Sequence, residues 1–497
     1  GMSTAAAPEQ VALRPPAQVM KLARMGSFHA SRLSFMRILM RRMKAEGWTF
    51  ACPVFEIDDQ GVGHAVLSAK TPHRTYSLVA FAHDLPADKR SDRVIAEAWD
   101  CTYALFDGVP EQGDIDRLRK NVPYQEAGRV SERELTLSRT NRSVRMFDHV
   151  VARLAEGRQP DEDMIRQVGY LMRTTAVYGS GKFGASDYQA ICERPEFAAP
   201  FQAEMLTVYL IRDFVRRLAE HLARAKGGDR AVGLAPDLAR RLGIGNSTGL
   251  GMAPFLVNHP ALLNNWIAAR ETALARVCAL PADAEDLSAF ATLVDRARAS
   301  AADWHSDHPL QQGKLADLRR DLDLLAAHLA ESPPTGAAPW DALYRWAEAT
   351  LSLEGQEQVV SLLLERHGPL VDDLADSMSL RREPVRIDGA ATIAATRRAL
   401  KATYGWALDT DWDDPEAIAR VWYVSAEKLE PRMGERFSEP VAPYEQPLAP
   451  GRDAAALHAA LDDWPDDAPI ADLLLARPEH RHLCLFYTSD AADEHRD

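Results

Sequence analysis

Residues 48–57 (WTFACPVFEI), 62–69 (VGHAVLSA) and 74–83 (RTYSLVAFAH) decide the fold class of this 497-residue chain. Each stretch is rich in β-branched and aromatic residues, which favour strands. Turn-forming residues separate the stretches, first Asp58-Asp59-Gln60-Gly61 and then Thr71-Pro72-His73. We therefore predict a three-stranded antiparallel meander.

The rest of the chain has helical patterns. We expect a helix over Arg90–Phe106 to cover one face of the meander, and almost everything from about Asp114 onward to be helical. Ser131 and Glu134 form an S-x-x-E capping box, which predicts a helix running to about Glu156. The acids at 161–163 open the next helix, which Gly179 can close. Further helices are expected at Phe197–Ala225, Pro260–Ala279, Ala284–Asp303 and Lys314–Glu331, with shorter ones to about Glu430.

These patterns predict an α+β protein that is predominantly α-helical, with a small N-terminal antiparallel sheet followed by a large multi-helix region. No strand–helix–strand alternation indicates a large parallel sheet. The proline-rich stretch at 331–339 (ESPPTGAAP) is the clearest linker. The expected organisation is a disordered lead (1–16), the N-terminal helix with the meander (17–110), a helical domain with two glycine-rich loops (111–330), a C-terminal helical domain (340–482) and a tail (483–497).

The final residues have an unusual sequence. Residues 484–494 (CLFYTSDAADE) resemble the translation of a transposon mosaic-end sequencing adaptor. This resemblance covers eleven residues and implies a non-native tail from residue 483. A natural, polar, disordered tail is the alternative.

Composition limits the class of function. A net charge of −14 argues against a nucleic-acid partner, because binding to phosphates needs a basic surface. Five scattered cysteines with no Cys-x-x-Cys pair indicate reduced thiols, and hence a cytoplasmic protein. No apolar run approaches the roughly 20 residues of a membrane span.

The N-terminal helix, residues 17–46, is the basic exception. It carries seven Lys and Arg residues against one acid, Glu46. Such a helix can lie on an anionic membrane or act as a targeting peptide. We expect it instead to pack on the acidic body of its own chain.

The stretch Gly243–Pro260 (GIGNSTGLGMAPFLVNHP) is the first candidate site. Its spacing fits neither a dinucleotide fingerprint nor a P-loop. Its glycines allow close approach of the backbone to a ligand, and Asn246, Ser247 and Thr248 offer hydrogen-bond donors to an anion. A long connection between two helices is the alternative.

A second glycine-rich loop, Tyr178–Gly184 (YGSGKFG), follows Arg173. Arg173 and Lys182 are candidates to bind a carboxylate or a phosphate there. The alternative is a glycine C-cap, with the lysine stabilising the negative end of a helix.

The third candidate lies on the helix predicted to begin at Ser131. At 100° per residue, Arg142, Arg145 and His149 share one face. Two arginines could hold an anion, and a histidine could transfer a proton. A plain solvated face is the alternative.

No metal site is predicted. His305 and His308 in the string at 303–308 (DWHSDH) could share a helix face, but Pro309 follows and no third ligand can be assigned. No catalytic triad, zincin or cysteine-nucleophile motif is present. The sequence does not identify a cofactor.

Together these features favour an enzyme acting on a small anionic metabolite, such as a carboxylate, a phosphate or a thioester, bound at the glycine-rich loops. His149 or His259 would be the proton-transfer group. A non-catalytic helical scaffold or assembly protein is the alternative. With either function, a homo-oligomer is a possible assembly.

Overall fold

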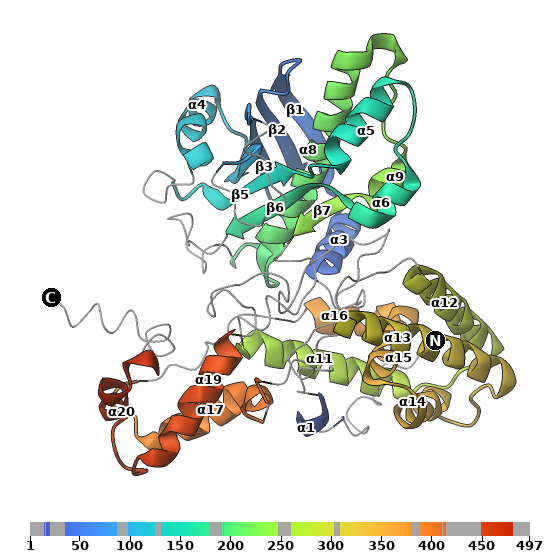
Figure 1. Cartoon of the computed structure of the whole chain (residues 1–497), viewed down its shortest axis with the longest axis vertical. Coiled ribbons are helices and arrows are strands. Elements are labelled where there is room, and N and C mark those ends of the chain that lie inside the picture. Colours follow the sequence, from blue (N-terminus) through green and yellow to red (C-terminus); the bar gives the residue numbers. More distant parts are fainter. Residues whose placement is uncertain are drawn as a thin grey trace.

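The computed structural model describes residues 14, 16–19, 35–86, 98–124, 131–178, 191, 193–246, 260–302, 309–376, 378, 388–409, 411–413 and 449–480. It confirms the fold class, an α+β protein that is mostly α-helical (Figure 1). The expected tail at 483–497 lies outside the described residues, as does most of the lead.

Within the described ranges the sheet has seven strands, and they neighbour one another in chain order. The first six pair with one another in antiparallel fashion, and the seventh pairs in parallel with the sixth. The strands are β1 (Thr49–Ile57), β2 (Gly63–Lys70), β3 (Thr75–Ala82), β4 (Cys101–Asp107), β5 (Glu134–Arg142), β6 (Tyr170–Tyr178) and β7 (Gly243–Asn246).

Strands β1 to β3 form the predicted meander. In the turn between β1 and β2, Asp58 Oδ1 accepts hydrogen bonds from the amides of Gln60 and Val62. Gly61 has φ +85°, a conformation that favours glycine. The sheet therefore begins where turn chemistry and strand composition agree.

Strand β4 corrects the prediction of a helix over Arg90–Phe106, of which residues 90–97 lie outside the described part. Tyr103 and Leu105 pack in the core on one face of the sheet, while Ala104 and Phe106 pack in a second core on the other. A strand buried on both faces is a continuous apolar run, which periodicity does not distinguish from a buried helix.

The prediction of one helix from Ser131 to Glu156 is wrong, because Glu134–Arg142 forms strand β5. The Ser131 amide does donate to Glu134 Oε2 at 2.7 Å, as in a capping box, but Glu134 begins a strand. The other oxygen of Glu134 lies 2.6 Å from the guanidinium of Arg117 in an ion pair. The helix α5 begins only at Met146 and runs to Ala155.

The prediction that the next helix runs as far as Gly179 is wrong, because Tyr170–Tyr178 forms strand β6. The helix α6 (Glu162–Val168) starts as predicted, with Asp161 Oδ1 accepting from the Asp163 amide. It ends at Gly169, which has φ +77°. The next nine residues form β6, which pairs with β5, so the sheet extends well beyond residue 110, where the expected sheet region ended.

Helices cover both faces of the sheet. The 26-residue helix α8 (Gln202–Gly227) and α5 pack on one face, and α4 (Gln112–Asn121) packs on the other (Figure 1). Thr136 of β5 meets Thr207 of α8, with 2.7 Å between the hydroxyl oxygens. The short helix α9 (Pro236–Arg241) lies between α8 and β7 in sequence.

A helical bundle follows the sheet in sequence. Its helices are α11 (Pro260–Cys278), α12 (Ala284–Ala302), α13 (Pro309–Glu331), α14 (Pro339–Thr350), α15 (Leu353–Arg366) and α16 (Gly368–Asp376), and α17 (Ile393–Leu408), α19 (Ala449–Ala460) and α20 (Ile470–Ala476) come after them. Phe290 of α12 and Trp340 of α14 have ring centroids 5.2 Å apart. Helices on both sides of the expected linker at 331–339 thus pack on one another, and the division of the chain into domains stays a prediction.

The helix α3 (Phe35–Glu46) joins the sheet to the bundle (Figure 1). Phe35 packs edge-on against Phe201, next to α8, with 5.2 Å between the ring centroids. Arg37 pairs with Glu365 of α15, and the guanidinium of Arg41 lies 3.5 and 3.2 Å from the carboxylates of Asp372 and Asp376 of α16. For these residues, the prediction that the basic helix packs on the acidic body is confirmed.

Candidate functional site

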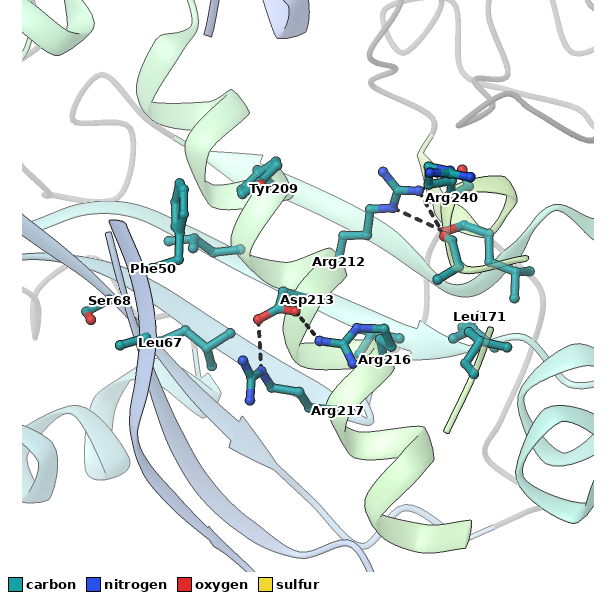
Figure 2. Close-up of a pocket in the computed structure, with 16 residues that line it drawn as sticks. Phe50, Leu67, Ser68, Leu171, Tyr209, Arg212, Asp213, Arg216, Arg217 and Arg240 are labelled. Carbon is teal, nitrogen blue, oxygen red and sulfur yellow. Dashed lines mark hydrogen bonds and ion pairs between the residues drawn. The ribbon is translucent and has the colours of Figure 1, made fainter. Parts of the chain in front are cut away.

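A groove of about 320 Å³ runs beside α8, between the β1–β2 edge of the sheet and the segment around α9 (Figure 2). Its larger aliphatic side chains are Leu67, Leu171, Leu210, Val215, Leu234 and Leu242, all buried. Its charged side chains are Arg212, Asp213, Arg216, Arg217 and Arg240.

The polar wall of the groove comes from the partly exposed face of α8. Arg212 and Asp213 follow Tyr209 by three and four positions, and Arg216 follows Asp213 by three, which places these residues on one side of a helix. The opposite side of α8 is apolar and buried in the core against the sheet. The amphipathic pattern that docks the helix therefore also aligns its charged residues along the groove.

The edge strand β1 supplies an aromatic residue at one end. Phe50 is 41% exposed, and its ring centroid lies 5.3 Å from that of Tyr209. Pro53 lies within β1, where the pairing with β2 shifts register between Ala51 and Val54. Proline is tolerated on an edge strand because it has no amide hydrogen to donate to a neighbour.

Asp213 is shared by two arginines. Its Oδ1 accepts from Arg216 at 2.6 Å, and its Oδ2 accepts from Arg217 at 2.9 Å (Figure 2). Partial burial by itself would raise the pKa of Asp213, but the hydrogen bonds and charges of Arg217 and Arg216 outweigh it and hold the pKa below its ordinary value. Arg216 also binds Glu220 at 2.9 Å.

Arg212 is bound differently. Its guanidinium donates to the carbonyl oxygens of Leu242, Ala239 and Arg240 at 3.2, 2.9 and 2.7 Å. These carbonyls belong to the C-terminal end of α9, where a cation is favourable. Burial lowers the pKa of Arg212 from its ordinary value, but a guanidinium stays charged in proteins.

The groove is therefore cationic. The described residues that line it include four arginines and one aspartate, while the whole chain has a net charge of −14. Arg240 is exposed, at the other end of the groove from Phe50 (Figure 2). Arginine side chains present donors that match the oxygens of a carboxylate or a phosphate.

The residues predicted from sequence lie elsewhere. Arg142 ends β5, with its guanidinium 4.5 Å from the Phe147 ring centroid and its Nε 3.7 Å from Asp100 Oδ1. Arg145 is the exposed N-cap residue of α5. The predicted helical face of Arg142, Arg145 and His149 is therefore wrong, because only His149 lies within the helix.

His149 connects α5 to α6. Its Nε2 accepts a hydrogen bond from the Asp161 amide at 3.0 Å, which requires that nitrogen to be unprotonated. Burial, and then the charge of Arg153, lower the pKa of His149 from its ordinary value. In this contact the ring fixes the loop that opens α6.

Arg173 and Arg142 lie on opposite faces of the sheet. Arg173 pairs with Asn141, and Arg142 pairs with Met172, and neighbours along a strand alternate in direction. The Arg173 guanidinium donates to the Tyr170 hydroxyl at 2.6 Å. None of the candidates whose side chains are described (Arg142, Arg145, His149 and Arg173) lines the groove, and their roles in binding or catalysis stay predictions.

The glycine-rich loops are largely outside the described residues. The stretch that begins at Gly243 starts as strand β7, with Asn246 level with Thr174 of β6, which corrects the expectation of a loop there. Pairing in parallel with β6 is a long-range contact that the local sequence does not encode. The remaining candidates, Lys182, Ser247, Thr248 and His259, lie outside the described part.

Sequence reasoning missed the arginines of α8 and α9. The signal was present in the stretch at 212–217 (RDFVRR), where charged residues recur one turn apart on a helix that was itself predicted. What could not be seen was that β1 and α9 flank this face.

Neither a metal centre nor a membrane span is found in the described part of the chain. Its residues hold no group of three or more His, Cys, Asp or Glu side chains placed to share a metal ion. The string at 303–308 lies outside them. Within the same ranges, no helix is both long and apolar enough to cross a membrane.

Comparison with protein families, curated proteins and solved structures found no match to this chain. The groove and its charges are therefore the basis for assigning a function.

Proposed function

We propose that this protein binds a small organic anion with a flat apolar part in the groove beside α8. The observation that carries the proposal is the excess of arginine over acid in a groove with an apolar floor. As in the sequence-based hypothesis, the proposed ligand is a small anion. The proposed binding site, however, is formed by α8, β1 and α9 instead of by the glycine-rich loops.

The arginines support the anionic end of the ligand. Arg212 uses carbonyl oxygens rather than a carboxylate as its hydrogen-bond partners among the described residues, so its positive charge is not neutralised by an ion pair there. Arg216 and Arg217 share Asp213. A carboxylate or phosphate in the groove would complete the charge balance, because opposite charges attract more strongly where water is partly excluded.

The apolar side chains support the rest of the ligand. A volume of about 320 Å³ is at the lower end for a small-molecule site. Phe50 and Tyr209 offer ring surfaces at one end, and leucines form the floor. An aromatic carboxylate or an aryl phosphate combines these requirements in one molecule.

We propose binding alone, without catalysis, at this groove. Its described lining contains neither histidine nor cysteine, and Asp213 is held ionised by two arginines. An enzyme that used this groove would take its proton-transfer group from elsewhere in the chain. We also propose a cytoplasmic location, which the free thiols of Cys52, Cys101 and Cys278 support.

A thermal-shift series with charged and neutral pairs tests the proposal. Benzoate and phenyl phosphate are compared with benzamide and phenol at constant ionic strength. A ligand at 100 times its Kd stabilises the folded state by about 2.7 kcal/mol, so the anions should raise Tm and the neutral analogues should not. Equal shifts within each pair, or no shift with any compound, would contradict the proposal and favour the scaffold alternative.

A matched pair of variants locates the effect. Arg216 pairs with Asp213 and Arg320 pairs with Asp317, each three residues apart on a helix. Arg216→Gln should reduce the response to phenyl phosphate, whereas Arg320→Gln, on α13, should leave it unchanged. Equal responses from both variants would place the anion outside the groove.

A further inference from the structure

A second arginine-centred site lies in the helical bundle and does not involve the groove. The guanidinium of Arg14 lies among Glu271 of α11, Tyr344 of α14 and Glu357 of α15. The side chains of Arg14, Glu271 and Glu357 are 6%, 5% and 1% exposed. The sequence predicts a disordered lead over residues 1–16, but the side chain of Arg14 is anchored here.

The contacts match the shape of a guanidinium. Nε and Nη2 of Arg14 donate to the two oxygens of Glu271 at 2.6 and 2.7 Å, in a bidentate arrangement. Nη1 donates to the Tyr344 hydroxyl at 2.7 Å and to Glu357 Oε1 at 3.0 Å. An ammonium group has no planar fork and cannot reproduce these four bonds.

Among the described residues, the charges of this cluster balance. Arg270 of α11 binds the second oxygen of Glu357, so two arginines face two glutamates. Burial alone would lower the pKa of Arg14, but the hydrogen bond to Glu271 and the charge of Glu357 raise it above its ordinary value. Without a guanidinium at this position, both oxygens of the buried Glu271 would lose the partner described above.

The pocket and its occupant come from different parts of the chain. The helices α11, α14 and α15 pack on one another, whereas Arg14 is separated from Glu271 by 257 positions. Arg14 precedes the four-residue helix α1 (Pro16–Val19), where Gln18 binds Glu348 at 3.0 Å and Val19 is buried. The bundle thus forms the binding site, and the N-terminal segment supplies the guanidinium that occupies it.

We propose that Glu271, Glu357 and Tyr344 form a guanidinium-binding site that the chain fills with its own Arg14, and that takes up a free alkylguanidinium when that side chain is removed. The ligand class is a guanidinium on a short alkyl chain, such as an arginine side chain. The proposal rests on the contacts of the bundle and is independent of the anion groove.

Chemical rescue of Arg14→Ala in the full-length chain tests this proposal. Ethylguanidinium supplies the atoms that the substitution removes, and ethylammonium at equal ionic strength is the control. Arg14→Ala should lower Tm, and ethylguanidinium at millimolar concentration should restore at least half of the loss. Equal effects of the two cations, or no effect of either, would overturn the proposal.

Two further proteins complete the experiment. In the double variant Arg14→Ala/Glu271→Gln, rescue should disappear because the bidentate partner is gone, and retained rescue would count against the site. If Arg14→Ala does not accumulate in folded form, the yield of refolding with each cation gives the same comparison. Wild-type protein, whose site is filled, should show no specific response to ethylguanidinium, and a response equal to that of Arg14→Ala would place the cation elsewhere.

Discussion

Two regions of this molecule are built around arginine side chains, and they differ in burial and in charge balance. Around Arg14, two arginines and two glutamates lie almost completely buried, and their charges balance. Along α8, four arginines line an open groove with one aspartate among the described residues. A buried, balanced cluster ties the N-terminal segment to the bundle, whereas an accessible cationic groove can attract an anion from solution.

The largest expected loss of stability comes from a substitution in the buried cluster around Arg14. Glu357→Gln removes the charge that binds Arg14 and Arg270, and breaking a buried ion pair costs about 3–5 kcal/mol. The free energy of unfolding, measured by urea titration, should fall accordingly. A loss below about 1 kcal/mol would show that these charges remain hydrated and that the contrast with the groove is false.

Arg212→Ala should have the next largest effect on stability. The substitution removes the donor from three carbonyls at the end of α9, and a hydrogen bond to a charged group contributes about 1.5–3 kcal/mol. Because water can reach part of the vacated space, we expect a total loss of about 1–3 kcal/mol, together with weaker binding of phenyl phosphate. Unchanged binding, measured by calorimetry, would remove Arg212 from the proposed site.

The stability of the protein and ligand binding in the groove should also differ in their response to pH. His367 is buried in the bundle, 5.4 Å from Trp340 between ring centroids, and burial lowers its pKa in the folded state below the ordinary value of about 6.5. Well above pH 6.5 the ring is neutral in both states and its stabilising contribution is complete. As the pH falls below about 6.5, the unfolded chain takes up the proton first, so stability declines until the pH reaches the folded-state pKa.

The slope of this decline is at most about 1.4 kcal/mol per pH unit for one histidine. Urea midpoints between about pH 7.5 and 5.5 should fall less steeply for His367→Gln than for wild type. Benzoate binding should stay constant over the same range, because the described lining of the groove contains no histidine. Parallel slopes for variant and wild type would contradict the assignment to His367.

The smallest expected effect on stability belongs to Arg216→Gln. The Arg216 side chain is 32% exposed in its ion pairs with Asp213 and Glu220, and exposed pairs contribute about 0–1 kcal/mol. The urea midpoint should therefore match that of Arg320→Gln, while the affinity for phenyl phosphate falls about tenfold or more only in Arg216→Gln. A large loss of stability would indicate that Arg216 has a packing role instead.

The parts of the fold that sequence predicted are those whose signals are local. Strands β1 to β3 have turn chemistry at Asp58–Gly61 and at Thr71–His73, and α8 and α11 to α13 have helical spacing over long segments. Strand β4 was missed because both of its faces are apolar, and β5 because Ser131 and Glu134 imitate a helix start. The alternation of leucine with Thr and Ser at 135–138 could have indicated β5.

The site was harder to predict because its walls are distant in sequence. Phe50 of β1, Asp213 of α8 and Leu242 after α9 line one groove, and only the tertiary fold brings these segments to it. The same holds for Arg14, whose partner Glu271 follows by 257 positions. Sequence spacing identifies faces of single helices, but it does not show which faces come together.

A crystal structure with 4-bromobenzoate tests the central claim most directly, because the anomalous signal of bromine locates the ligand. We expect one bromine in the groove near Phe50 and Tyr209, with the carboxylate on Arg212 or Arg216. Bromine bound at another place, with an empty groove in protein that binds the compound in solution, would contradict the assignment of the groove as the anion site.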